Sequence, residues 1–219
     1  MTAGLEMGTK DMEHMNRVKG ITKQTDNRFL NLYEFQAERR NGRVAPYYVV
    51  SRNGDPKKLK AVTHENKADG VVIYGVYGNN RDKIVLIKQF RYPINAYVYE
   101  FPAGLVESGE DMFEAAIREI YEETGLKFEP KKVSNAYTRP YFTTVGMTDE
   151  ACGTVYGYCS GMPSNAHQED SEDIEIVLAD REECKRILRE ENVAIKCAYM
   201  LMHFVHCTDT DPLCFLEEI

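Results

Sequence analysis

In the first half of the chain, short stretches of apolar residues alternate with polar ones and are separated by turn-forming residues such as Asn-Gly and Asp-Pro. A period of two residues bounded by turn signals is typical of β-strands. The pattern predicts strands at 29–38, 44–52, 70–76, 82–90 and 97–101. We expect the strands at 70–76 and 82–90 to form a hairpin around Asn79-Asn80.

In the second half of the chain, some stretches show the strand period of two residues and others show a helical spacing of apolar residues. Apolar spacing of three to four residues predicts helices at 181–190 and 194–207. Strands are predicted at 132–139, 150–158 and 174–178. This interleaving indicates an α+β fold in which a mixed sheet is covered by helices on both faces.

One further helix is predicted at 109–124, between the predicted strands of the two halves. Ser108, followed three residues later by Asp111, predicts a capping box, and Gly125 predicts a left-handed end. An apolar stripe is expected to seat this helix on the core, and it consists of Phe113, Ile117, Ile120 and Thr124.

Three acids lie together on another face of the same predicted helix. Glu119, Glu122 and Glu123 fall within an arc of roughly 100°, since residues three and four apart are neighbours on a helix. Their mutual repulsion is unfavourable, whereas a hard divalent cation such as Mg²⁺, or alternatively Mn²⁺, makes the cluster favourable. Arg118 stands four residues before Glu122 and can brace it. The alternative is an acidic face that contacts only water.

The composition narrows the functional classes. The chain has 219 residues, a formal net charge of -8 and a sequence pI near 5.3. Proteins that bind nucleic acids or membrane surfaces usually carry a positively charged surface patch, so neither partner is expected for this acidic chain. No apolar run approaches the roughly 18 residues of a membrane span, and no signal-peptide segment is recognisable. The six cysteines show no disulfide or CxxC spacing, which favours free thiols and a cytoplasmic location.

The run from Gly104 to Leu126 has defined residue types at fixed offsets. It contains Gly104, then Glu110 after five residues, and Arg118-Glu119 after seven more, followed by Glu122-Glu123 and Gly125. This arrangement resembles the signature G-x5-E-x7-R-E-U-x-E-E-x-G-U of the Nudix hydrolases, where U is aliphatic. The resemblance implies a metal-dependent hydrolase of nucleoside diphosphates linked to another moiety, built on an α/β/α sandwich.

A second resemblance narrows the family. The runs KQFR at 88–91 and EFPAG at 100–104 are similar to the ADP-ribose and ADP-sugar pyrophosphatase branch. That likeness implies a small N-terminal β domain exchanged across a homodimer. It also assigns roles to individual residues. The implied metal ligands are the Ala103 carbonyl, Glu119 and Glu123, with Glu122 assisting. The implied substrate contacts are Arg91, Glu100 and, from the other subunit, Arg52.

The general base is not fixed by the signature. In this branch it is a glutamate in a loop before a late strand, and here that loop reads HQEDSED. Glu172 matches best, Glu169 is the alternative, and Glu122 remains if neither serves. A solvated acidic loop is the other interpretation.

The absence of tryptophan departs from the branch, which commonly stacks adenine on N-terminal aromatics that include Trp. Phe29, Tyr47 and Tyr48 could stack the base instead, or they could be ordinary strand residues. Cys197, His203, His206 and Cys207 are interpreted as parts of an apolar helix rather than as a zinc site.

These observations predict four segments and one activity. We expect a mobile leader at 1–26, an N-terminal β domain at 27–62, a Nudix hydrolase domain at 63–207 and a tail at 208–219. The expected reaction is Mg²⁺-dependent hydrolysis of the pyrophosphate bond of ADP-ribose or a related nucleoside diphosphate sugar, giving AMP and a sugar phosphate, which is ribose 5-phosphate in the case of ADP-ribose. The alternatives are hydrolysis of GDP-mannose or another nucleotide sugar, and ligand sensing without catalysis.

Overall fold

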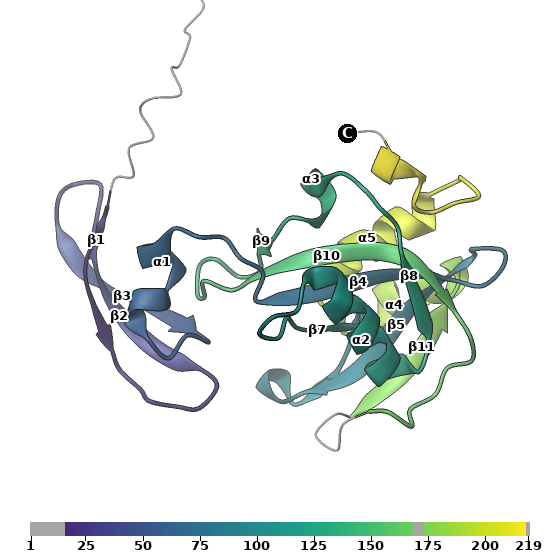
Figure 1. The fold of residues 1–219 in the computed structure, drawn as a ribbon, viewed down its shortest axis with the longest axis horizontal. Helices are drawn as coiled ribbons and strands as arrows, with labels where there is room; N and C mark the ends of the chain where they lie inside the picture. Colours follow the sequence, from purple (N-terminus) through teal and green to yellow (C-terminus); the bar gives the residue numbers. More distant parts are fainter. Residues whose placement is uncertain (1–15, 169–172, 218–219) are drawn as a thin grey trace, which may run out of the picture. The chain divides into compact units, whose positions relative to one another are not determined.

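A computed structural model describes residues 16–168 and 173–217, and the chain divides into two compact units (Figure 1). Unit 1 takes in the described residues up to Asn66 together with Thr143–Glu150. Unit 2 takes in Lys67–Phe142 and the described residues from Ala151 onwards.

Unit 1 is built on a three-stranded antiparallel sheet in the order β1 (Val18–Lys23), β2 (Asn31–Glu38), β3 (Val44–Ser51). The strand β1 lies within the range expected to be a leader. A 3-10 turn η1 (Pro56–Lys58) and a short helix α1 (Lys60–Thr63) follow β3. The small core under this sheet consists of Tyr33, Phe35, Val49 and Leu59.

Unit 2 contains an eight-stranded mixed sheet. Its main path runs β11 (Ile174–Ala179), β5 (Lys83–Arg91), β4 (Gly70–Tyr77), β10 (Ala151–Ser160), β8 (Lys127–Pro130). Three short strands extend it: β6 (Ala96–Glu100) pairs with β5, β7 (Ala103–Leu105) with β4, and β9 (Tyr141–Phe142) with β10. The β4 and β10 pair is parallel, and the other ladders are antiparallel.

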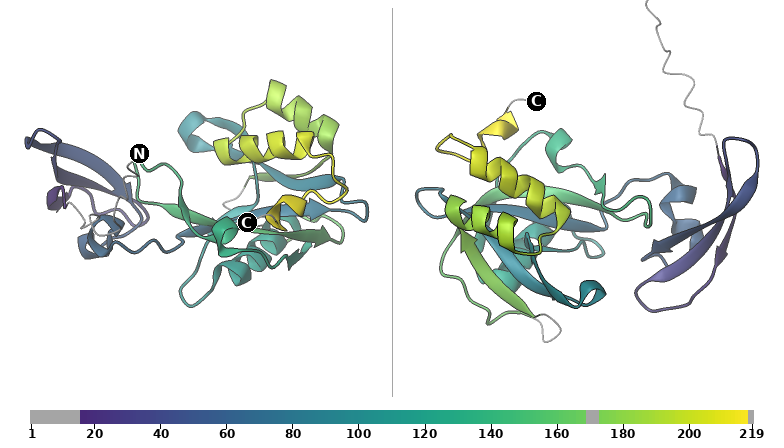
Figure 2. Two further views of the ribbon diagram at one scale, coloured as in Figure 1. Left: turned by 90° about the horizontal axis from the view of Figure 1, so that it is seen from above. Right: turned by 180° about the vertical axis from the view of Figure 1, so that it is seen from behind.

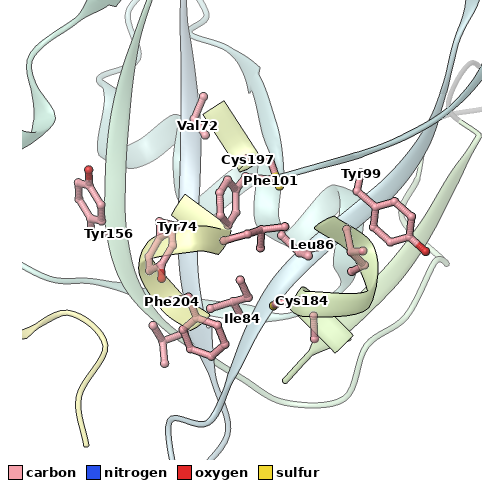
Figure 3. Close-up of a cluster of buried hydrophobic side chains, with 14 of the residues drawn as sticks. Val72, Tyr74, Ile84, Leu86, Tyr99, Phe101, Tyr156, Cys184, Cys197 and Phe204 are labelled. Atoms are coloured by element: carbon pink, nitrogen blue, oxygen red, sulfur yellow. The ribbon is translucent and has the colours of Figure 1, made fainter. Parts of the chain in front are cut away.

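Helices cover both faces of this sheet (Figure 2). Along β4, Val71 and Ile73 pack towards α2 (Met112–Thr124), whereas Val72 and Tyr74 pack towards the opposite face. That face is covered by α4 (Arg181–Glu190) and α5 (Ile195–His206). Figure 3 shows the core on this side, with Tyr74 of β4 beside Phe204 of α5. The predicted α/β/α sandwich with a separate small β sheet is therefore confirmed.

Short helical segments complete unit 2. They are η2 (Tyr92–Ile94), α3 (Asn135–Thr138) and η3 (Cys214–Glu217). No helix in the described ranges is long and apolar enough to cross a membrane.

The predicted strand at 132–139 is wrong. The chain pairs with β10 earlier, through β8, and then leaves the sheet to form α3. The hydroxyl of Ser134 caps this short helix by accepting from the Ala136 amide at 3.4 Å. Val133 and Tyr137, four residues apart, both pack on the core. The apolar residues in this stretch therefore follow a helical spacing.

The start and the buried face of α2 also differ from the prediction. The N-cap is Asp111, whose carboxylate accepts from the Glu114 amide at 2.9 Å while Glu114 accepts from the Asp111 amide at 3.0 Å. Phe113 and Ile117 are 36% and 45% exposed, so half of the expected apolar stripe faces outward. The buried face instead carries Ala115, Ala116, Glu119, Ile120, Glu123 and Thr124.

Candidate active site

Two carboxylates of α2 point into the protein beside strand β7. Glu119 is 9% exposed and Glu123 is 2% exposed. The amide of Ala103 donates a hydrogen bond to Glu123 Oε2 at 3.2 Å. A Cβ on Gly104 would lie only 1.8 Å from Glu119 Oε1, so the missing side chain provides the space that the Glu119 carboxylate fills. Strand and helix thus converge on one pair of buried acids.

Arg118 organises the outer side of this pair. Its guanidinium donates two hydrogen bonds to Glu110, both at 2.9 Å, and one each to Glu119 at 2.8 Å, Glu122 at 3.0 Å and the Leu105 carbonyl at 3.0 Å. All five guanidinium N–H groups are therefore used. The hydrogen bonds that Arg118 donates to Glu110 raise the pKa of Arg118 and lower the pKa of Glu110. The expected brace between Arg118 and Glu122 is confirmed.

The donor set fits a hard divalent cation. Two acids four residues apart on one buried helix face are costly unless a cation compensates them. Arg118 reaches Glu119 and Glu122, and Glu122 lies on the more accessible edge with its side chain 42% exposed. Carboxylate and backbone carbonyl oxygens are the ligands that Mg²⁺ and Mn²⁺ prefer. Ala103, Glu119, Glu122 and Glu123 are the residues here that would hold such an ion.

Comparison with known proteins places most of the chain in one family. The NUDIX domain matches residues 66–194, which is more than half of the chain. The chain belongs to the NUDIX family. The matched range contains the whole of α2, Arg118 and the buried glutamate pair. Glu119 and Glu123 therefore lie within the matched domain.

Individual relatives agree with this assignment. The NUDIX chain is 42% identical over 81 residues to an ADP-sugar pyrophosphatase of Mus musculus, covering 36% of this chain and 37% of that one. It is 27% identical over 168 residues to an ADP-ribose pyrophosphatase of Bacillus subtilis, covering 74% and 86%. A crystal structure of an ADP compounds hydrolase shares the fold with a TM-score of 0.56 at 16% identity, covering 79% and 82%.

Coverage of the curated relatives is uneven. The matches span 61% of a Caenorhabditis elegans nudix hydrolase and 37% of the mouse protein, so less than two thirds of either.

Arg91 and Glu100 form an ion pair in unit 2. Arg91, at the end of β5, donates to the two carboxylate oxygens of Glu100 at 2.6 Å and 2.9 Å, a bidentate pair. Glu100 ends β6, three residues before Ala103. Its carboxylate therefore orients the guanidinium that the sequence predicts to contact substrate, and this role stays a prediction.

The two ends of the acidic loop are fixed by contacts that sequence reasoning missed. Gln168 donates its amide to the Glu123 carbonyl at 2.7 Å, and His167 stacks on Tyr121 with ring centroids 4.5 Å apart. On the other side, the Tyr97 hydroxyl donates to Asp173 at 2.6 Å. Of the residues in these contacts, Tyr121 lies within the signature, at a position where the signature allows any residue, so the sequence did not point to it. Glu169 and Glu172, the predicted bases, lie outside the described residues.

The remaining predicted substrate residues belong to unit 1. Phe29 is 66% exposed, and Tyr47 and Tyr48 of β3 are 46% and 54% exposed. Arg52 follows β3 and pairs with Glu150 at 3.1 Å. Tyr47 donates to the Gly146 carbonyl at 2.6 Å. The loop at 143–150 thus contacts β3 within this unit, and the substrate roles of Phe29, Tyr47 and Arg52 stay predictions.

Replacing Gly104 by alanine is expected to reduce turnover by about 10²-fold with little loss of stability. The new Cβ would displace the Glu119 carboxylate, which is the flexible end of a side chain and can move. Steady-state kinetics and thermal denaturation measure the two effects. Gly54→Ala is the matched control, because nothing lies within 4 Å of a Cβ there. Turnover above half of the wild-type value in Gly104→Ala would show that the position of Glu119 is not critical.

Proposed function

We propose that this chain hydrolyses the pyrophosphate bond of ADP-ribose or a related nucleoside diphosphate sugar, giving AMP and a sugar phosphate. The observation that carries the proposal is the buried Glu119 and Glu123 pair seated against Ala103 and Gly104. The substrate class is supported by the names of the mouse and Bacillus relatives.

Different residues are proposed to bind the metal ion, the diphosphate and the adenine. A Mg²⁺ ion, or alternatively Mn²⁺, would supply neutralisation of the negative charge on the phosphate oxygens. The Ala103 carbonyl, Glu119, Glu122 and Glu123 hold it, and Arg118 keeps the acids in place. Arg91, oriented by Glu100, binds the diphosphate. Phe29 and Tyr47 stack the adenine, and Arg52 of a second subunit contacts the phosphates.

The bond changes are those of hydrolysis. A water oxygen bonds to one phosphorus while the bridging P–O bond breaks, and the leaving phosphate keeps the bridging oxygen. The water proton passes to a general base, for which we propose Glu172 with Glu169 as the alternative.

A turnover screen tests the proposal. The full chain is incubated with Mg²⁺ and, in separate reactions, ADP-ribose, ADP-glucose and GDP-mannose, and the nucleotide monophosphate is quantified chromatographically. We expect the highest kcat/KM for ADP-ribose, with AMP and ribose 5-phosphate in equal amounts. A preference for GDP-mannose would replace ADP-ribose as the substrate. The absence of turnover with every sugar and with either Mg²⁺ or Mn²⁺ would instead favour a ligand-sensing protein.

We also propose a homodimer formed through unit 1 and located in the cytoplasm. The sheet of unit 1 exposes Tyr48 at 54% and Val44 at 46%, while its core holds only four residues. Exposed apolar patches of this kind mark interaction sites. The six free cysteines suit a reducing compartment.

Sedimentation velocity at micromolar concentration is expected to give a dimer. Tyr48→Glu is expected to shift it to a monomer, because a charge is costly to bury in an apolar interface. Tyr199→Glu, at a tyrosine of α5 that is 64% exposed and lies in unit 2, should leave the dimer intact. A monomeric wild-type chain contradicts the prediction.

A further inference from the structure

Two cysteines and an aspartate meet where α5 ends and the C-terminal segment begins. Cys207 is the C-cap of α5, and Cys214 begins η3. Their sulfur atoms and a carboxylate oxygen of Asp209 all lie within 4.8 Å of one another. The Cys214 thiol donates to Asp209 Oδ2 at 3.2 Å.

The surrounding fold holds these groups in place independently of any ligand. Leu213 and Leu216, on either side of Cys214, are 0% and 3% exposed. Phe215 packs on His203 of α5 with ring centroids 4.4 Å apart. Buried neighbours therefore fix the η3 backbone against the end of α5. The three polar side chains remain partly or fully accessible at the surface, where an ion can reach them.

The turn between the two cysteines is fixed as well. Asp211 accepts hydrogen bonds from the Tyr158 hydroxyl at 2.6 Å, from Arg81 at 2.8 Å and from the Leu213 amide at 3.0 Å. These contacts tie the loop at 208–213 to the neighbouring strands. The convergence of Cys207, Asp209 and Cys214 is thus a property of the scaffold.

We propose that Cys207, Asp209 and Cys214 form a zinc site. Thiolate sulfur is a soft ligand that selects Zn²⁺ over Mg²⁺, and Zn²⁺ binds two thiolates, a carboxylate and a water in a tetrahedron. With Zn–S bonds of about 2.3 Å, adjacent ligand atoms of that tetrahedron are about 3.5–3.8 Å apart. The present separations reach this geometry by side-chain adjustment. Binding releases the two thiol protons to solvent.

The proposed zinc site differs from the NUDIX acids, Glu119, Glu122 and Glu123, in the chemistry of its ligands and in its position in the fold. The acids project from α2 on one face of the sheet, whereas α5 covers the opposite face (Figure 2). A bound ion closes the loop from Cys207 to Cys214 and holds the C-terminal segment on α5. Because the site shares no residue with the proposed active site, it does not depend on the proposed hydrolysis.

Cobalt provides a spectroscopic test, because Co²⁺ replaces Zn²⁺ and gives an intense charge-transfer absorption only with thiolate ligands. The full chain is reduced, freed of metal with a chelator, and titrated with Co²⁺ in excess Mg²⁺, which occupies the NUDIX acids. We expect saturation at one Co²⁺ per chain and loss of the absorption on adding Zn²⁺. Zn²⁺ alone should raise the melting temperature.

Variants locate the site. Cys207→Ser and Cys214→Ser should each lower the absorption by at least half and remove the Zn²⁺-dependent stabilisation, and Asp209→Asn, at an exposed side chain, should weaken Zn²⁺ binding about tenfold. Cys152→Ser and Glu123→Gln are the matched controls and should keep the absorption. No absorption in the wild-type chain would overturn the proposal. So would an absorption of undiminished intensity in Cys207→Ser and Cys214→Ser, and so would equal Zn²⁺ affinity in wild type and Asp209→Asn.

Discussion

Replacing Glu123 by glutamine is expected to lower kcat by about 10³-fold or more, a loss of roughly 4 kcal/mol of transition-state stabilisation. Glutamine has the same shape and can still accept the Ala103 amide, but it lacks the charge of a metal ligand. Glu119→Gln should behave similarly, because the two acids share one buried face. Turnover at saturating Mg²⁺ measures the effect.

Although Glu123→Gln is expected to lower activity, it is not expected to lower the stability of the protein. In metal-free protein, Glu123→Gln removes one of two buried like charges, so the melting temperature should stay constant or rise by up to about 2–4 °C. Glu114→Gln is the matched control, since glutamine can keep the capping-box bond to Asp111 and activity should be unchanged. Either active-site variant retaining more than about a tenth of wild-type turnover would disprove the metal assignment.

Glu172→Gln is expected to reduce kcat by roughly 10²–10⁴-fold while KM and Mg²⁺ affinity stay nearly constant. A general base acts only in the chemical step, so its loss leaves substrate and metal binding in place. The anchored residues on either side of it, Gln168 and Asp173, are the reason to expect its loop to meet the substrate. Single-turnover kinetics separates the chemical step from binding.

Glu175→Gln is the matched control for the base. Glu175 lies three residues further along, on β11, with a side chain that is 70% exposed. An unchanged kcat in Glu172→Gln with a large fall in Glu169→Gln would move the role to Glu169. A normal kcat in both would assign it to a signature glutamate such as Glu122.

The sequence predicted the position of α2 well but not the face it buries. Hydrophobicity places Phe113 and Ile117 inward and the charged side chains outward. The structure does the reverse at Glu119 and Glu123, whose burial makes sense for metal ligands and costs the helix stability otherwise. Local patterning cannot anticipate such a functional exception, and the family resemblance was the better guide to these acids.

Other differences come from contacts between residues distant in sequence. The link from Arg118 to Glu122 follows from helical spacing, whereas its bonds to Glu110 and Leu105 require the turn before α2. The strand β1 was missed because its apolar residues are few and its register with β2 shifts between Val18 and Ile21. In the C-terminal segment, the apolar run from Leu213 to Leu216 is too short to show a period.

The parallel ladder between β4 and β10 also constrains the order in which the protein folds. Gly70 pairs with Cys152, about 80 residues later, and the pairing continues to Tyr77 and Cys159. During synthesis, β4 emerges long before β10, its parallel neighbour in the sheet, and seven of the eight residues of β4 are buried in the folded protein. Parallel pairing over such a separation is slow, and unpaired apolar strands are prone to aggregation. A nascent chain that ends before β10 therefore leaves the β10-facing edge of β4 unpaired, where another chain can add a strand.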